Sequence, residues 1–181
     1  GSGSSGGSGV KIGGLDKQDD ISPTIAIVYR DVDETHWAYD AIAELTNQKV
    51  LTGFSNGTFL PEKPVTRAEF ICAALKYKKE NTVAYADAFE DVKSEDWFAP
   101  YVQKAFDKRY VLGDGSCFHP QSNITREEMA VMIARMFQLS AKEGSVFSDA
   151  EQISDWALSA VETLSAENII NGRDDNRFCP K

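Results

Sequence analysis

A repeat of about 60 residues constrains the fold of this chain more than any other feature of its sequence. The three tryptophans, Trp37, Trp97 and Trp156, lie 60 and 59 residues apart, and the same order of residues surrounds each of them. An aromatic-x-Asp segment precedes each tryptophan, and a helical apolar period, an apolar pair with a nearby glycine, and an aromatic residue with a proline follow it. A unit of two helices cannot bury its apolar faces alone, so neighbouring copies must pack on each other.

The first two copies continue into a second predicted helix that opens with the pattern Thr-Arg-x-Glu. These segments start at Thr66 and Thr125, and both fit a capping box, in which the threonine hydroxyl and the glutamate satisfy backbone N–H groups reciprocally. Apolar residues then follow at helical spacing. We therefore predict an all-α fold of three tandem helix-loop-helix repeats. The Thr-capped helices should lie near the centre, with the Trp-led helices outside.

The repeats divide the chain into segments. Residues 1–9 contain only Gly and Ser and are interpreted as a flexible linker or tag, and residues 10–27 are interpreted as a polar lead-in. Repeat 1 is predicted at 28–86, repeat 2 at 87–144 and an incomplete repeat 3 at 145–181, because the sequence reaches Lys181 before a third Thr-Arg-x-Glu pattern. The apolar partners of that helix are expected to be exposed unless another segment, self-association or a partner protein covers them.

The order of these motifs resembles S-layer homology (SLH) domains. The resemblance rests on the aromatic-x-Asp start, the Trp-led helix, the glycine turn, the Phe-x-Pro loop and the Thr-Arg-x-Glu box, and it covers residues 28–181. It implies a pseudo-threefold arrangement of three repeats around a central bundle of the Thr-Arg-x-Glu helices. It also implies an extracellular, non-catalytic module that anchors surface proteins to secondary cell-wall polymers of bacteria, often through a pyruvylated and hence anionic amino sugar.

The resemblance further implies a ligand site. In SLH domains the polymer lies in grooves between adjacent repeats, and the arginine of the Thr-Arg-x-Glu box is a principal contact. That role falls on Arg67 and Arg126 in this sequence. Helix chemistry supports the assignment, because unpaired backbone N–H groups at a helix start favour anions. The planar guanidinium can also hold a carboxylate through two parallel hydrogen bonds.

The repeat also singles out aromatic and glycine positions as candidate groove residues. Trp37, Trp97 and Trp156 are expected mainly to pack within their repeats, with one edge available to line a groove. Gly53 and Gly113 are expected first to close helices as left-handed turn residues, with loops whose position lets them line the pocket.

Charge and composition narrow the partners of the chain. Lys and Arg number 19 against 28 Asp and Glu, which gives a net charge of −9. An acidic chain lacks the basic face that nucleic acids need, and no apolar run reaches the roughly 18 residues of a membrane span. Repulsion from an anionic polymer is screened beyond about 8–10 Å at physiological salt, so a local site can still bind. The acidic clusters and both histidines lack the spacing of EF-hand or zinc sites, so neither a metal nor a cofactor is expected.

Two other classes of function are alternatives to a cell-wall anchor. Helical repeats could serve self-assembly or lattice contacts of a surface layer without binding a glycan, although that role needs no paired arginine at the helix start. A glycoside hydrolase needs two carboxylates about 5 or 6.5–9.5 Å apart in a cleft, and no acidic residue stands out from the predicted caps and turns. We therefore predict a cell-wall anchor and no catalytic residues.

Overall fold

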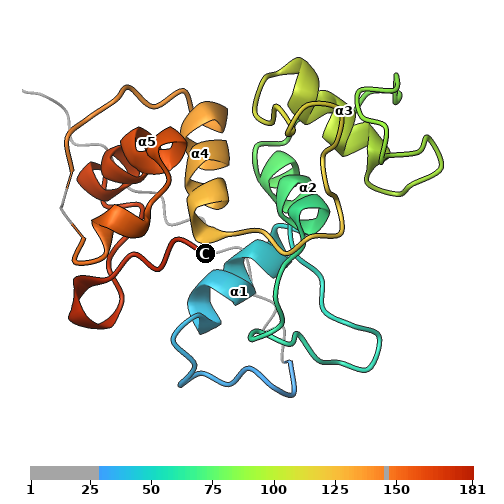
Figure 1. The fold of residues 1–181 in the computed structure, drawn as a ribbon. Coiled ribbons are helices and arrows are strands. Elements are labelled where there is room, and N and C mark those ends of the chain that lie inside the picture. The colour runs from blue at the N-terminus through green and yellow to red at the C-terminus, as the bar shows by residue number, and fades with distance from the viewer. Residues whose placement is uncertain (1–28, 145–146) are drawn as a thin grey trace, which may run out of the picture.

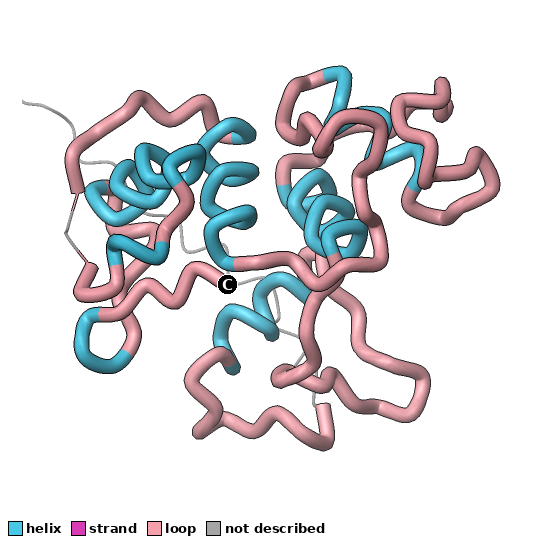
Figure 2. Tube along the Cα trace, viewed as in Figure 1, coloured by secondary structure: helices cyan, strands magenta, loops and turns pink. Residues whose placement is uncertain are grey.

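Five α-helices and two short 3₁₀ helices form the regular structure in the computed structural model, which describes residues 29–144 and 147–181. The α-helices are α1 (Tyr39–Asn47), α2 (Arg67–Tyr77), α3 (Ala99–Asp107), α4 (Arg126–Met136) and α5 (Asp155–Ala166), and the 3₁₀ helices are η1 (Ala150–Gln152) and η2 (Asp174–Asn176). Within these two ranges there are isolated β-bridges but no strands (Figure 1, Figure 2). The predicted all-α class is confirmed, and the segments predicted at 1–9 and 10–27 lie outside the described residues.

Capping boxes open both Thr-Arg-x-Glu helices, as predicted. The Thr66 hydroxyl accepts from the backbone N–H of Glu69, and the Glu69 carboxylate accepts from the backbone N–H of Thr66. Thr125 and Glu128 make the same reciprocal pair at the start of α4. Each cap contributes about 1 kcal/mol and fixes the residue at which its helix begins.

The helices pair across repeat boundaries. α2 packs against α3 of the next repeat, and α4 packs against α5 of the repeat after that (Figure 1). The largest buried side chains of the first core include Ile71, Leu75, Val102 and Phe118, and those of the second include Val161, Leu164 and Phe178. Each Thr-Arg-x-Glu helix is therefore packed into the core of the repeat that follows it in the sequence.

α2 and α4 run parallel to each other in the middle of the molecule. Arg67 at the start of α2 pairs with Glu128 at the start of α4, and Lys78 after the end of α2 donates to the carbonyl of Met136 at the end of α4. Met132 and Met136 also enter the α2–α3 core. The Thr-capped helices thus lie centrally, with α3 and α5 outside them (Figure 1).

The core around α1 is much smaller. Ile42 of α1 is buried with Tyr29 and Val32, and Phe59 packs against this group. Within the described residues no Thr-Arg-x-Glu helix packs on α1 as α2 packs on α3 and α4 on α5. Counting only the residues that the structure describes, the first repeat is consequently held by fewer apolar contacts than the other two.

An aspartate fixes the Phe-x-Pro loop in every repeat. Asp31, Asp91 and Asp149 each accept hydrogen bonds, at 2.6 to 2.8 Å, from two consecutive backbone N–H groups of their own loop. The second donor residue of each pair has a positive φ, between 55° and 59°. The donor pairs are Phe59 and Leu60, Phe118 and His119, and Phe178 and Cys179. The aspartate of the aromatic-x-Asp motif is therefore a loop clamp.

Candidate functional site

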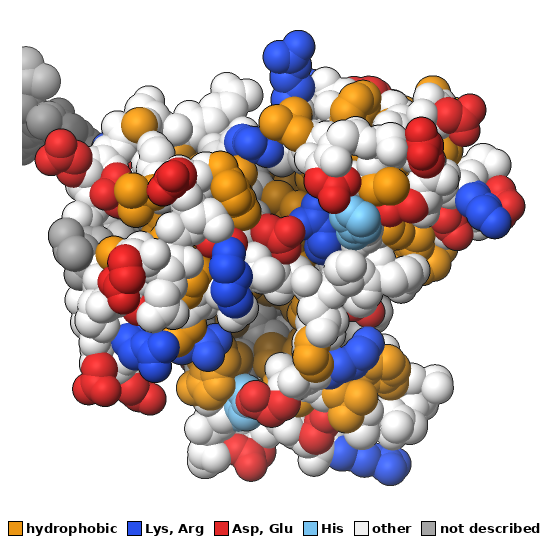
Figure 3. All heavy atoms as spheres, viewed as in Figure 1, with side chains coloured by type: hydrophobic (Ala, Val, Ile, Leu, Met, Phe, Trp, Pro, Cys, Tyr) orange, Lys and Arg blue, Asp and Glu red, His pale blue; other side chains and the backbone are white. Residues whose placement is uncertain are grey.

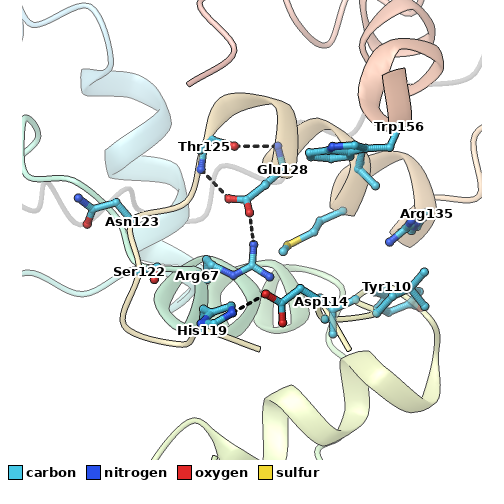
Figure 4. A pocket seen from close by; sticks show the side chains of 15 residues that line it. Arg67, Tyr110, Asp114, His119, Ser122, Asn123, Thr125, Glu128, Arg135 and Trp156 are labelled. Carbon is cyan, nitrogen blue, oxygen red and sulfur yellow. Dashed lines mark hydrogen bonds and ion pairs between the residues drawn. The ribbon is translucent and has the colours of Figure 1, made fainter. Parts of the chain in front are cut away.

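A hollow of about 560 Å³ receives residues from all three repeats. On the surface it lies between the part formed by α4 and α5 and the part formed by α2 and α3, where basic, acidic and apolar side chains meet (Figure 3). Its charged and aromatic lining includes Arg67, Asp114, His119, Glu128, Arg135 and Trp156 (Figure 4). The mixture of guanidinium, carboxylate and exposed indole groups is suited to a polar ligand with an anionic substituent.

Arg67 is first of all a clamp between repeats 1 and 2. Its Nε–H donates to the carbonyl of Phe118 at 2.8 Å, and one Nη–H donates to Glu128 at 2.5 Å (Figure 4). The guanidinium also lies 5.0 Å from the centre of the Phe118 ring. Only 11% of the side chain is exposed. Two of its donors are thus committed to the protein, and the remaining N–H groups can face the hollow.

Arg126 repeats the same clamp one repeat later. It donates to the carbonyls of Phe178 and Asn171 at 2.9 and 2.7 Å, and its guanidinium lies 5.1 Å from the centre of the Phe178 ring. Burial, assisted by the nearby charge of Arg173, lowers the pKa of Arg126 below its ordinary value. Arg126 lines neither this hollow nor the smaller one beside it. The structure therefore brings only one of the two predicted arginines to the described hollows.

The backbone N–H groups expected to favour an anion at the helix start are already used. Those of Arg67 and Ala68 donate to the carbonyls of Ser122 and Pro120, at 2.9 and 3.1 Å. The N–H of Glu127 in α4 is satisfied in the same way by the loop of repeat 3, at 3.1 Å. The expectation of free amide donors beside Arg67 is therefore wrong, because the loop of the next repeat occupies their place.

The tryptophans are far more exposed than expected. The exposed fraction is 89% for Trp37, 60% for Trp97 and 58% for Trp156. The prediction that they mainly pack inside their repeats is wrong, because the neighbouring Phe98 takes the buried position in repeat 2, with 3% exposed. Trp37 instead stacks on His36, and Trp97 meets Phe98 edge-on. Of the three, Trp156 lines the hollow, whereas Trp37 and Trp97 line neither described hollow.

The two candidate glycines have different conformations. Gly113 lines the hollow with a φ of 72°, in the left-handed region. Gly53 lines neither hollow and does not have a positive φ, which corrects the expectation of a left-handed turn there. A Cβ at Gly53 would lie 2.1 Å from the Tyr29 ring, so close approach of the backbone to that ring explains the glycine.

Several residues that line the hollow belong to none of the repeated motifs. Asp114 and His119 come together in a hydrogen bond of 2.7 Å between a carboxylate oxygen and Nε2. Arg135 lies inside α4, where no motif marks it. It falls seven residues after Glu128, with Val131 and Met132 between them, so helical spacing alone places these side chains on one face. That periodicity was the available signal.

The described residues thus form a helical repeat domain with a charged hollow, lined by Trp156, between its repeats. The sequence matches the family model described as the S-layer homology domain three times, at residues 28–71, 88–130 and 146–181. The chain belongs to the S-layer homology domain family and is an extracellular, cell-surface anchoring module. No helix among the described residues is long and apolar enough to cross a membrane.

Similar proteins carry the same segment inside longer chains. Exoglucanase XynX from Acetivibrio thermocellus is 35% identical over 162 residues, which cover 86% of this chain and 15% of that protein. The cellulosome-anchoring protein of Acetivibrio thermocellus is 31% identical over 80% of this chain and 33% of its own length. The surface-layer 125 kDa protein of Lysinibacillus sphaericus is 30% identical over 77% of this chain and 12% of its own length. The family is a non-catalytic module that enzymes and surface proteins contain as one part.

The Arg67–Glu128 pair is expected to stabilise the contact between α2 and α4. Arg67→Met leaves the partly buried Glu128 carboxylate without its charged partner, so we expect a loss of about 2 kcal/mol in the free energy of unfolding. In a double-mutant cycle with Glu128→Gln, measured by urea denaturation, the coupling should be about 1–2 kcal/mol.

The matched pair in repeat 1 provides the control for this cycle. Lys63 and Glu69 lie 3.3 Å apart, but 47% and 39% of their side chains are exposed. Their coupling should be close to zero because solvent screens exposed ion pairs. Equal coupling in the two cycles, or strictly additive effects of Arg67→Met and Glu128→Gln, would contradict the clamp.

Proposed function

We propose that this domain anchors its parent protein by binding an acidic secondary cell-wall polymer, with a carboxylate-bearing sugar, such as a pyruvylated amino sugar, held in the hollow between the repeats. The observation that carries the proposal is the meeting of Arg67, Arg135 and the exposed Trp156 in one cavity of about 560 Å³. A cavity of this volume is within the range of small-molecule sites. Cell-wall anchoring agrees with membership of the S-layer homology family.

The chemistry of each wall matches a different part of such a ligand. The indole of Trp156 offers an apolar face to the C–H groups of a pyranose ring. The guanidinium groups offer charged N–H donors to a carboxylate. The paired Asp114 and His119 stand at the wall of the same hollow and offer polar atoms to sugar hydroxyls (Figure 4). Groups that could contact a sugar ring and groups that could bind a carboxylate thus line the same hollow.

The net charge of the chain favours a local mode of binding. At −9 the chain repels an anionic polymer, but this repulsion is screened at separations beyond about 8–10 Å at physiological salt. Affinity should therefore depend on the groups inside the hollow and weakly on ionic strength. The affinity of a basic surface for a polyanion would instead fall steeply as the salt concentration rises.

The proposal is tested by calorimetric titration with purified pyruvylated wall polymer, native and after mild-acid removal of the pyruvate. We expect binding to the native polymer and at least about tenfold weaker binding once the carboxylate is removed, because a charge-assisted hydrogen-bonded pair is lost. Trp156→Ala should also weaken binding about tenfold. Trp97→Ala is the matched control, because Trp97 has a similar exposure of 60% but lines neither hollow.

Sedimentation measurements at the same protein concentrations separate anchoring from self-assembly. The proposal is supported if the monomer binds the polymer and if binding weakens both on removal of the pyruvate and in Trp156→Ala. Absence of binding by the wild-type chain, together with concentration-dependent association, would overturn it and favour a lattice role. Equal losses in Trp156→Ala and Trp97→Ala would place the ligand outside this hollow.

A further inference from the structure

The charges that line the hollow are not equally available to a ligand. The guanidinium of Arg67 is paired with the carboxylate of Glu128, and the imidazole of His119 is paired with the carboxylate of Asp114, at 2.7 Å. Arg135 is the remaining charged group of the lining. Among the residues that the structure describes, its guanidinium makes no hydrogen bond, ion pair or ring contact. Its positive charge is therefore not offset inside the hollow.

Arg135 also has a distinctive position. A second hollow of about 390 Å³ lies beside the first, and Val131, Arg135 and Trp156 line both. Part of Arg135 is exposed to solvent, yet partial burial lowers the pKa of its guanidinium below the ordinary value. The group stays protonated, because an arginine pKa starts far above neutrality. A charged, partly desolvated guanidinium without a partner among the described residues thus lies beside the exposed Trp156 indole, where the two hollows meet.

The equivalent position in α2 shows that this is not a general property of the repeat. When the two Thr-Arg-x-Glu helices are aligned on Arg67 and Arg126, Lys76 corresponds to Arg135. The ammonium group of Lys76 lies 5.9 Å from the centre of the Tyr101 ring and lines neither hollow. The lysine also lacks the planar fork that binds both oxygens of a carboxylate.

We propose that Arg135 binds the carboxylate of the anionic glycan, while Arg67 chiefly holds the walls of the hollow together. This assignment rests on the proposed function of the same hollow. An unpaired guanidinium can make two parallel hydrogen bonds to a carboxylate without first giving up a protein partner. Arg67, in contrast, already shares its charge with Glu128 and supplies at most its remaining N–H groups.

The test compares Arg135→Gln with the wild-type chain by calorimetric titration of pyruvylated wall polymer, before and after mild-acid removal of the pyruvate. We expect Arg135→Gln to weaken binding of the pyruvylated polymer by about 10- to 100-fold, as expected for a lost hydrogen-bonded ion pair. Its binding of the depyruvylated polymer should match that of the wild type. Arg135→Lys keeps the positive charge but lacks the planar fork of the guanidinium. Its affinity for the pyruvylated polymer should therefore lie between those of the wild type and Arg135→Gln.

Arg30→Gln is the matched control, because it removes the same exposed charge from a residue that lines neither hollow. The affinity of Arg30→Gln should equal that of the wild type. The melting temperatures of both glutamine variants should also equal that of the wild type, since the Arg135 guanidinium has no hydrogen bond, ion pair or ring contact with any described residue. Unchanged affinity of Arg135→Gln, while the wild type distinguishes the two polymers, would overturn the assignment and leave the proposed function standing. A wild-type chain that binds neither polymer would overturn both. Equal weakening for both polymers would also overturn the carboxylate assignment.

Discussion

Gly113→Ala is expected to destabilise the domain by about 3 kcal/mol, as the sum of backbone strain and overpacking. The φ of Gly113 is 72°, a conformation that costs any residue with a Cβ. An added Cβ would lie 2.5 Å from Cε1 of Phe89 and 2.6 Å from the carbonyl oxygen of Cys117. Phe89 is buried in the α2–α3 core, so its ring has little space to move. The turn and the core beneath it would both have to shift.

Gly115→Ala provides the control two residues away. Its φ is 104°, but an added Cβ would meet no atom within 4 Å. The free energy of unfolding of Gly115→Ala should fall only by the cost of the positive φ, about 1 kcal/mol. Urea denaturation followed by circular dichroism measures both free energies of unfolding. A loss of less than 1 kcal/mol in Gly113→Ala, or equal losses in the two variants, would show that the Phe89 contact is not rigid.

The local structure of each repeat could be predicted from its sequence because its signals are local. Capping boxes at Thr66 and Thr125 start helices in the structure, since the hydrogen bonds that define them join residues three positions apart. Apolar periodicity likewise shows which face of a helix is buried. It does not show which neighbour buries that face. The packing of α2 on α3 and of α4 on α5 therefore appears only in three dimensions.

The candidate site was harder to predict, because its residues are defined by long-range contacts. The Thr-Arg-x-Glu motif marks Arg67 without revealing that Phe118, 51 residues away, accepts its hydrogen bond. The regular spacing of the tryptophans predicts that they are buried anchors. Such a repeat shows only that tryptophan recurs at the same sequence position, and it does not determine how exposed the side chain is. Arg135 belongs to no motif, and its significance comes from lacking a partner among the residues that the structure describes. A missing partner is a property of the folded surroundings, and no spacing within α4 reports it.

Asp149→Asn is expected to cost about 3 kcal/mol at neutral pH, because hydrogen bonds to a charged acceptor contribute about 1.5–3 kcal/mol each. The carboxylate of Asp149 is 2% exposed and accepts from the N–H groups of Phe178 and Cys179 at 2.6 and 2.8 Å. The asparagine oxygen can accept one of these bonds, but its amide nitrogen would face the other N–H as a second donor. Phe178 is itself fully buried in the α4–α5 core, so the loop cannot easily move to solvent.

The same contacts predict how this cost depends on pH. Burial alone would raise the pKa of Asp149, but the N–H donors of Phe178 and Cys179 hold it below its ordinary value. A carboxyl group whose pKa is lower in the folded state stabilises the fold above its unfolded pKa of about 3.9, and this contribution is lost as the pH falls through the folded pKa. The wild-type chain should therefore lose stability below about pH 4. The asparagine of Asp149→Asn does not titrate in this range. The difference in the free energy of unfolding between the wild type and Asp149→Asn should therefore become smaller as the pH falls.

Asp31→Asn separates the effect of burial from the effect of the clamp. Asp31 accepts from two loop N–H groups at 2.8 and 2.7 Å, with nearly the same geometry, but it is exposed to solvent. Backbone donation from Phe59 lowers its pKa as well, so its contribution should disappear over the same acidic range. Water can replace the lost hydrogen bonds at an exposed site, and we therefore expect a smaller loss of stability at neutral pH than for Asp149→Asn. Urea denaturation of the three proteins between neutral and acidic pH measures both effects. Equal losses at neutral pH would mean that the repeated hydrogen bonds alone, and not the burial of Asp149, set the strength of the loop clamp.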